Sequence, residues 1–217
     1  MNFTEYAHEP IPGLPGELPA GEEIRWQGAP EWKALARHAF HVRKVMAYFG
    51  VLVAWRLAEA GMDGMRGVEL AAAASWPLAF GIAAVGILSL LAWLNARATR
   101  YTITSRRVVL RFGVALPIAL TLPLRMIESA ALRRAGEHAG SIALKLVPTA
   151  RVSYLVGWPH MRPWSFTRPE PMLRDIPDAD AVARILADCW AQAPGTQSVP
   201  TPPASRDFAQ GAAGLAA

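Results

Sequence analysis

The stretch from Leu70 to Leu94 constrains the fold more than any other part of the chain, because it carries no charged side chain. At about 1.5 Å of rise per residue, a helix of this length reaches roughly 37 Å. That is enough to cross a hydrocarbon core of about 30 Å with some tilt. The stretch therefore predicts a transmembrane helix over 68–94, and every other segment has to be placed relative to a bilayer.

A second apolar segment, VMAYFGVLVAW at 45–55, precedes this stretch. It is too short to span alone, but a helix over 42–60 spans if the charged side chains at its two ends reach the interfaces. An interfacial or buried helix is the alternative interpretation. Because only a short glycine-rich connection at 61–67 separates the two segments, we predict an antiparallel transmembrane hairpin over 42–94.

Basic residues flank this hairpin on its outer sides, whereas the connection between the helices has only Arg66. Those before it are Arg25, Lys33, Arg37, Arg43 and Lys44, and those after it are Arg97, Arg100, Arg106, Arg107 and Arg111. The positive-inside rule then places both termini in the cytoplasm. Because the N-terminal sequence lacks the pattern of a signal peptide, we expect the first span to remain as an uncleaved anchor.

Composition agrees with a membrane protein that also has a part folded in water. Hydrophobic residues make up 53% of the chain and the mean hydropathy is +0.20, which is high for a soluble domain. Much of the net charge of +5 is explained by residues that flank an anionic leaflet. No nucleic-acid recognition motif accompanies that charge. Cys189 is the only cysteine, which excludes an intrachain disulfide and suits a reducing compartment.

The N-terminal part divides into two segments. Residues 1–29 are rich in proline and glycine and predict an extended segment with a short β-like centre at 24–26. Residues 30–41 predict an amphipathic interfacial helix, with Trp32 at the level of the lipid headgroups. Packing of its apolar face on the soluble domain is the alternative.

From residue 100 the pattern changes to strands, which we expect at 101–104, 108–110, 115–122, 124–132, 142–147 and 152–157. The apolar stretch 112–124 raises the question of a third span, but about 13 residues with two prolines are too few. Asp178 or Asp180 can cap a following helix, whose apolar stripe runs from Val182 to Trp190. Residues 194–217 offer little to bury and predict a disordered tail.

Three stretches of this region resemble the bacterial PH-like domain of membrane proteins. They are YTITSRRVVLRFG at 101–113, LPLRMIES at 122–129 and LRDIPD at 173–178. The resemblance implies an α+β membrane protein. Its transmembrane helical hairpin is followed by a PH-like small β-barrel or sandwich over 98–193, which a C-terminal helix caps.

Motifs nearer the N-terminus are similar to those of the PuhB-type photosynthetic complex assembly proteins of purple bacteria. They are EPIPGLP at 9–15, LPAGE at 18–22, WQG at 26–28 and RHAFHVRKV at 37–45. The resemblance implies a non-enzymatic factor of the bacterial inner (intracytoplasmic) membrane that helps assemble the reaction centre and its core light-harvesting antenna.

The partners that this resemblance implies are reaction centre and core antenna subunits and membrane lipids, with a homodimer as a further option. No cofactor and no nucleic acid are expected. The alternative function is a general PH-like membrane module for lipid sensing or envelope-stress adaptation.

Several residues are candidates for contacts with partner proteins. Trp158, Arg162 and Trp164 lie in a loop-like stretch, and exposed Trp and Arg are frequent anchors of interfaces. Closure of the domain core by the two tryptophans is the alternative. In the second span, Gly81 and Gly86 belong to a surface of small residues that permits close helix approach. Its partner is the first span, a second copy or a client subunit.

Lipid headgroups are the other expected contact. The candidates are Trp32, Arg37, Arg43, Lys44, Arg106 and Arg107. Arg106 and Arg107 also fit a hairpin turn in solvent.

His38 and His41 are three positions apart, which would place them on one helix face as candidate pigment or haem ligands. An ordinary polar role at the interface is the alternative. No catalytic or metal-binding motif occurs, so we predict neither catalytic residues nor a metal site.

Overall fold

The computed structural model describes residues 13–14, 16–114, 116–135, 139–150 and 152–193. These residues form two units. The β-domain comprises the described residues up to Glu31 together with those from Ala98 onward, and the hairpin unit comprises Trp32–Arg97. The predicted disordered tail at 194–217 lies outside the described residues, as do residues 1–12 of the predicted extended segment.

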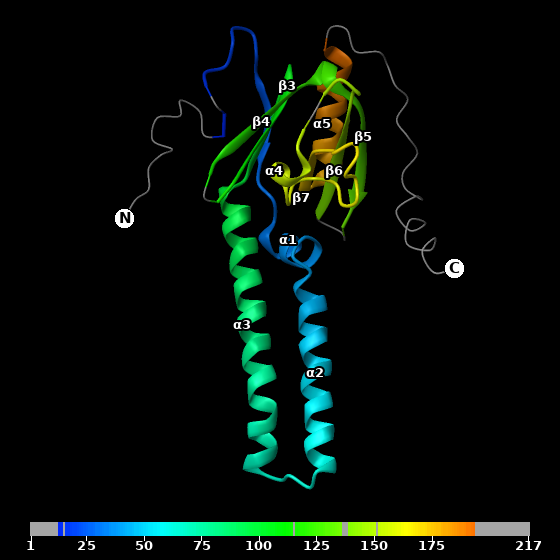
Figure 1. Cartoon of the computed structure of the whole chain (residues 1–217). Helices are drawn as coiled ribbons and strands as arrows, with labels where there is room; N and C mark the ends of the chain where they lie inside the picture. The colour runs from blue at the N-terminus through cyan, green and yellow to red at the C-terminus, as the bar shows by residue number, and fades with distance from the viewer. Residues whose placement is uncertain (1–12, 15, 115, 136–138, 151, 194–217) are drawn as a thin grey trace, which may run out of the picture. The chain divides into compact units, whose positions relative to one another are not determined.

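The hairpin unit begins with the short helix α1 (Trp32–His38) and continues with two long antiparallel helices, α2 (Val42–Met62) and α3 (Val68–Ala98; Figure 1). Both long helices are long and apolar enough to cross a membrane. The structure thus has the two predicted helices and extends the second by four residues. A small buried cluster of Ala36, Val42 and Ala92 packs α1 against the start of α2 and the end of α3.

The β-domain contains two antiparallel sheets. The first has the order β1 (Ile24–Gly28), β2 (Arg100–Thr104), β3 (Arg107–Phe112) and β4 (Ile118–Pro123). A single 3-10 turn, Leu124–Met126, leads into the second, formed by β5 (Ile127–Arg134), β6 (Ala139–Leu146) and β7 (Met172–Pro177). Two helices complete the domain, α4 (Tyr154–Gly157) and α5 (Ala179–Gln192).

The first sheet is built from parts of the chain that precede and follow the hairpin unit. Strand β1 pairs with β2 so that Gln27 lies opposite Thr102 and Gly28 opposite Tyr101. The hairpin unit is therefore inserted between two hydrogen-bonded neighbours of one sheet. The β-domain predicted over 98–193 omits its first strand, which comes from the segment expected to be a separate extended arm.

The core of the β-domain lies between the two sheets and under α5. Its buried side chains include Tyr101 and Leu110 from the first sheet and Leu144 and Leu173 from the second. The apolar stripe of α5 packs on the same core, and α5 contacts β5, β6 and β1. Because the strands pair in two separate sheets, the fold is a sandwich and not a closed barrel.

Two local predictions are wrong, and both concern the end of the domain. The expected strand at 152–157 is instead the single helical turn α4, whose Leu155 and Val156 face solvent. The last strand is β7, in which the buried charged pair Arg174 and Asp175 interrupts the alternation of apolar and polar residues. A β-bulge opposite Ser141 accommodates this pair, and Asp175 takes a positive φ of 48°.

The stretch 112–124 contributes to strands, as predicted, and not to a third span. Strand β3 ends at Phe112, and β4 returns antiparallel to it with Phe112 opposite Ile118. Gly113 opens the connection with φ of 117°, a backbone conformation that glycine adopts readily. At the start of α5, Asp178 occupies the N-cap position without a side-chain capping bond, whereas the Asp180 carboxylate pairs with Arg134.

Candidate functional site

The most exposed apolar surface of the β-domain lies on one segment, Tyr154–Phe166, which we call the aromatic loop. Its solvent-facing apolar side chains are Leu155, Val156, Trp158, Trp164 and Phe166. Trp158 is 51% exposed and Trp164 is 87% exposed, so neither tryptophan closes the core. The prediction that they bind a partner is compatible with this exposure and stays a prediction.

The aromatic loop is held in place by contacts at its ends and at its centre. The Met161 side chain is buried, and its backbone forms a β-bridge with Pro171. The Arg162 backbone N–H donates to the Glu170 carbonyl at 2.8 Å, and the two side chains form an ion pair at 2.7 Å. The rings of Tyr154 and Phe166 lie 4.7 Å apart between centroids. Arg162, a predicted partner contact, is therefore also part of the loop's own framework.

A buried polar network lies at the base of the aromatic loop and centres on His160, which is fully buried. Its Nδ1 lies 2.6 Å from Tyr101 Oη, and its Nε2 lies 3.1 Å from Thr99 Oγ1. Tyr101 Oη accepts the Arg174 backbone N–H at 3.3 Å, which leaves the phenolic hydrogen to be donated to His160 Nδ1. The neutral imidazole then carries its hydrogen on Nε2 and donates it to Thr99.

The electrostatic environment of this network keeps the imidazole neutral. Burial, together with the nearby Arg174 guanidinium, lowers the pKa of His160 to about 3. Burial also raises the pKa of the Tyr101 hydroxyl well above its usual value, so the phenol stays protonated. The charge of the network therefore does not change near neutral pH.

Strand β7 connects this network to both points at which the chain passes to the hairpin unit. Arg174 Nη1 donates to the Pro159 carbonyl at 2.7 Å, which holds the base of the aromatic loop. The Asp175 carbonyl accepts the backbone N–H of Glu31, the residue before α1, at 2.8 Å. Thr99 is the residue after α3. The aromatic loop and the two chain crossings therefore share one hydrogen-bonded frame.

A groove of about 530 Å³ runs beside the aromatic loop. Tyr154 and Phe166 of the loop line it together with Lys145, Arg168 and Glu170. Lys145 is paired with Glu128, and Glu170 with Arg162. Among the residues that the structure describes, no group of three or more His, Cys, Asp or Glu side chains is placed to bind a metal ion.

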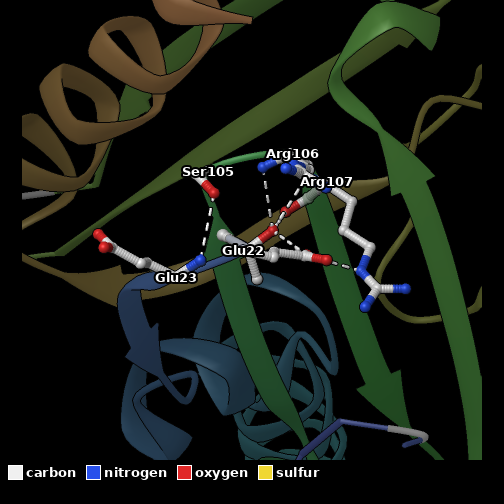
Figure 2. A network of polar contacts seen from close by, with 6 residues as sticks. Glu22, Glu23, Ser105, Arg106 and Arg107 are labelled. Atoms are coloured by element: carbon white, nitrogen blue, oxygen red, sulfur yellow. Dashed lines mark hydrogen bonds and ion pairs between the residues drawn. The ribbon is translucent and has the colours of Figure 1, made fainter. Parts of the chain in front are cut away.

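A second polar cluster ties the segment before β1 to the turn between β2 and β3 (Figure 2). The buried Glu22 carboxylate accepts the Thr104 hydroxyl at 2.6 Å and Arg107 Nε at 2.8 Å. The backbone N–H groups of Arg106 and Arg107 donate to Thr104 Oγ1, and that of Glu23 donates to Ser105 Oγ. This cluster fixes the segment leading into β1 to the β2–β3 turn.

Two of the predicted lipid contacts, Arg106 and Arg107, belong to this cluster. Arg106 and Arg107 lie at the opposite end of β2 from Thr99, because β2 runs from Arg100 to Thr104. Arg107 is paired with Glu22, whereas Arg106 is exposed. Their place in the β2–β3 turn is compatible with the hairpin-turn interpretation, and contact with lipid headgroups stays a prediction.

Within the hairpin unit, the two glycines predicted to bind partners have different surroundings. A Cβ atom on Gly81 would lie 2.9 Å from Phe49 Cβ, so Gly81 serves the close packing of α3 on α2. Gly86 faces open space. The other predicted lipid contacts, Trp32, Arg37, Arg43 and Lys44, are all exposed on this unit.

His38 and His41 do not share a helix face, so that prediction is wrong. Helix α1 ends at His38, and His41 takes a left-handed conformation with φ of 53° at the N-cap of α2. The intervening bend at 39–40 rotates the chain between the two helices. The geometric reason for proposing a shared tetrapyrrole ligand site is therefore absent.

The sequence alone does not reveal the two buried polar networks, although several of their residues lie in motifs described above. Tyr101, Arg174 and Glu22 all lie inside the quoted motifs YTITSRRVVLRFG, LRDIPD and LPAGE. His160 lies in no quoted motif, and its burial depends on contacts with residues about 60 positions away, which no local pattern reveals.

Comparison with known proteins agrees with this architecture. Residues 48–189 match the family described as Bacterial PH domain. A relative from Rhodobacter capsulatus, described as an uncharacterized 23.7 kDa protein in the puhA 5′ region, is 43% identical over 189 residues. The match covers 87% of this chain and 88% of the relative. No solved structure matches significantly. With two sheets of four and three strands packed under a C-terminal helix, the chain belongs to the bacterial PH domain family.

Proposed function

We propose that this protein is an integral membrane factor that assists assembly of the photosynthetic reaction centre and its core antenna without catalysing a reaction. The motifs at 9–15, 18–22, 26–28 and 37–45 support this, since they resemble the PuhB-type assembly proteins. The relative whose description places it in the puhA 5′ region points the same way. The PH-like domain and the two spans act by binding.

The observation that carries the proposal is the exposed apolar surface of the hairpin unit. Only 6% of the most apolar window of α2 and 17% of that of α3 are buried inside the molecule. A core helix of a soluble protein would be mostly buried, whereas these faces need lipid or other helices to cover them. Insertion into a membrane supplies both.

The pairing of β1 with β2 supports the predicted topology of two spans. These strands come from opposite sides of the hairpin unit in the sequence, yet they are hydrogen-bonded neighbours. If α2 and α3 cross the bilayer, their outer ends must therefore lie on one side of it. The basic residues that flank the hairpin favour the cytoplasmic side for that end and for both termini.

Within the spans, we assign client contacts to the surface around Gly86. Gly81 is occupied by Phe49 of the neighbouring helix, whereas the space beside Gly86 is open. Transmembrane helices of client subunits can approach closely at such a position. A second copy of this chain is the competing occupant of that surface.

The test is a deletion of the gene in its photosynthetic host, with complementation by the wild-type gene. We expect reduced amounts of reaction centre and core antenna, measured by their absorbance in isolated membranes, and restoration on complementation. Normal amounts of both complexes under photosynthetic growth would contradict the proposal. If the deletion instead alters survival under envelope stress, the general PH-like membrane module is the better assignment, since the family match itself carries no photosynthetic specificity.

A further inference from the structure

We propose that the hairpin unit binds an anionic phospholipid at the start of α2, where the side chains of Arg43 and Lys44 hold the lipid phosphate. The inference rests on the membrane insertion in the proposed function, and it concerns the hairpin unit alone. It assigns a lipid, and not an acidic segment of a client protein, as the counter-ion of these two cations.

Two contacts fix the register of α2 against α3. A Cβ atom on Gly81 would lie 2.9 Å from Phe49 Cβ, so these two residues face each other. Val42 and Ala92 belong to one small buried cluster, which gives a second level nearer the outer end of the hairpin, where α2 begins and α3 ends. Because the helices are antiparallel, each step from Val42 toward Phe49 is matched by a step from Ala92 toward Gly81.

This register places Lys44 beside an uncharged part of α3. Lys44 is two residues after Val42 and five before Phe49, so it lies at the level of residues 86–90. The uncharged stretch of α3 continues beyond this level to Leu94. At about 1.5 Å per residue, Lys44 therefore lies roughly 6–12 Å inside the outer end of that stretch. The arginine that precedes it lies one residue nearer to that end.

Neither cation has a counter-ion in the part of the chain that the structure describes. Arg43 and Lys44 are both exposed, and no ion pair joins either to a described acidic residue. From Trp32 to Ala58 the sequence has no acidic residue. Because an unpaired charge is costly beside hydrocarbon, the two long side chains extend toward the interface. The anions available there are lipid phosphates.

The other charged level of α2 is neutralised within the chain. Arg56 forms an ion pair with Glu59, three residues later, at 2.6 Å. The same register places Arg56 at the level of residues 74–78 of α3, which are also uncharged. The chain thus supplies a counter-ion for the cation of α2 at one level, whereas the level of Arg43 and Lys44 requires an anion from outside.

Helix α1 brings further positive charge to the start of α2. Its Ala36 lies in the buried cluster with Val42 and Ala92, so α1 packs at this junction. Lys33 and Arg37 of α1 are exposed and likewise have no acidic partner among the described residues. The first turn of α2 also carries no acidic side chain. This charge favours a lipid with a net negative headgroup over a zwitterionic one.

The face of α2 next to these cations is suited to an acyl chain. Met46 and Ala47 are three and four residues after Arg43, so they lie on the same helix face, further into the span. Both are exposed, and so is Gly50 one turn later. A phosphate group and an apolar chain are therefore accommodated together, which matches a phospholipid and not a free phosphate ion.

Electron spin resonance with spin-labelled lipids tests the inference on the full-length protein. The protein is reconstituted in phosphatidylcholine vesicles without any client, and a trace of phosphatidylglycerol or phosphatidylcholine carries a nitroxide near the end of one acyl chain. Lipids in contact with the spans give a motionally restricted component, whose share yields the relative affinity for the two headgroups. We expect phosphatidylglycerol to be preferred by about three- to five-fold.

Matched variants locate the preference. Lys44→Gln is expected to lower the affinity ratio about two-fold or more, and Arg43→Gln combined with Lys44→Gln to bring it close to one. Both side chains are exposed, so their replacement removes little packing. The charge-conserving pair Arg43→Lys with Lys44→Arg is expected to keep the preference. Arg66→Gln removes one exposed cation from the connection between the helices and is expected to leave the ratio unchanged.

The outcomes separate this inference from the proposed function. If neither labelled lipid gives a restricted component, the spans are not in lipid and the membrane insertion itself fails. If both lipids are restricted to the same extent, only the anionic lipid site is overturned, and an acidic protein segment becomes the better counter-ion. A preference that persists without Arg43 and Lys44, or that Arg66→Gln lowers equally, arises from net charge and would also overturn the assigned site.

Discussion

At the scale of single residues, the structure depends on buried polar groups whose hydrogen-bond partners are distant in the sequence. Glu22 is one of them, because its carboxylate accepts hydrogen bonds from Thr104 and Arg107 across more than 80 positions. Removing a charge from such a site leaves its donors without a full partner, which is costlier than losing a surface ion pair.

Glu22→Gln is therefore expected to lower the free energy of unfolding by about 1–3 kcal/mol. The matched control is Glu23→Gln. The adjacent Glu23 forms an exposed ion pair with Arg25, so its replacement is expected to cost less than about 0.5 kcal/mol. Urea titration of the detergent-solubilised protein, followed by tryptophan fluorescence, measures both. Equal effects of the two variants would show that the Glu22 cluster contributes no more than surface charge does.

His160 gives a prediction about pH. The folded state keeps the imidazole neutral down to about pH 3, whereas the unfolded chain takes up a proton near pH 6.5. Between these values the unfolded state binds more protons, so the free energy of unfolding decreases as the pH falls, by about 1.4 kcal/mol per unit.

In His160→Asn we expect this slope to flatten between pH 4.5 and 6, even though the variant is less stable at pH 7 because the bonds to Tyr101 and Thr99 change. His41→Asn, which alters an exposed side chain at a left-handed position that Asn tolerates, should retain the wild-type slope. Urea titrations at a series of pH values give these slopes. An unchanged slope in His160→Asn would contradict the role assigned to its burial.

At the scale of elements, the packing of α2 against α3 depends on one glycine. Gly81→Ile places new atoms against Phe49 and is expected to cost about 1–3 kcal/mol through overpacking. Gly86→Ile adds the same side chain where space is open, so its cost is expected to stay below about 0.5 kcal/mol. Thermal unfolding in detergent, followed by helical circular dichroism, compares the two variants. Should Gly86→Ile be the more damaging, the assigned helix interface is wrong.

The elements also show which parts of the fold the sequence could predict. The long helices and the apolar stripe of α5 were predictable, because uncharged length and a period of 3.6 residues are properties of the local sequence. Strand β7 was not, since its buried Arg174 and Asp175 pair with each other, and Arg174 also donates to the Pro159 carbonyl of another segment. Conversely, Leu155 and Val156 read as strand residues, yet they form an exposed turn. Tertiary contacts decided both cases.

At the scale of the whole molecule, the decisive feature is that the sequence of the hairpin unit lies between β1 and β2, two paired strands of one sheet. The β-like centre at 24–26 was visible in the sequence, but its partner was not, because strand pairing over 75 positions has no local signal. The same distinction between local and long-range information applies to the candidate site. For the two loop tryptophans the sequence left exposure and core closure open. Their exposure, and the histidine that bonds Thr99 at the base of the loop, required the fold.

This topology predicts a specific cross-link. Gln27 and Thr102 are opposite each other in β1 and β2, so Gln27→Cys with Thr102→Cys in a Cys189→Ala background is expected to form a disulfide when native membranes are oxidised. Glu23→Cys with Thr102→Cys is the control, since that register separates the pair by about three residues, or roughly 10 Å. Electrophoretic mobility without reductant reports the bond. Equal cross-linking of both pairs would contradict the register.

The insertion also imposes an order on biogenesis. When Gln27 emerges from the ribosome its neighbour Thr102 has yet to be translated, and at 5–20 residues per second the 75-position separation takes roughly 4–15 seconds. During that delay β1 lacks the backbone hydrogen bonds to β2, while the apolar helices α2 and α3 are being synthesised. The first sheet of the β-domain therefore closes only after both long helices have been synthesised, so a chain that ends within the hairpin unit has a β1 strand without its partner β2.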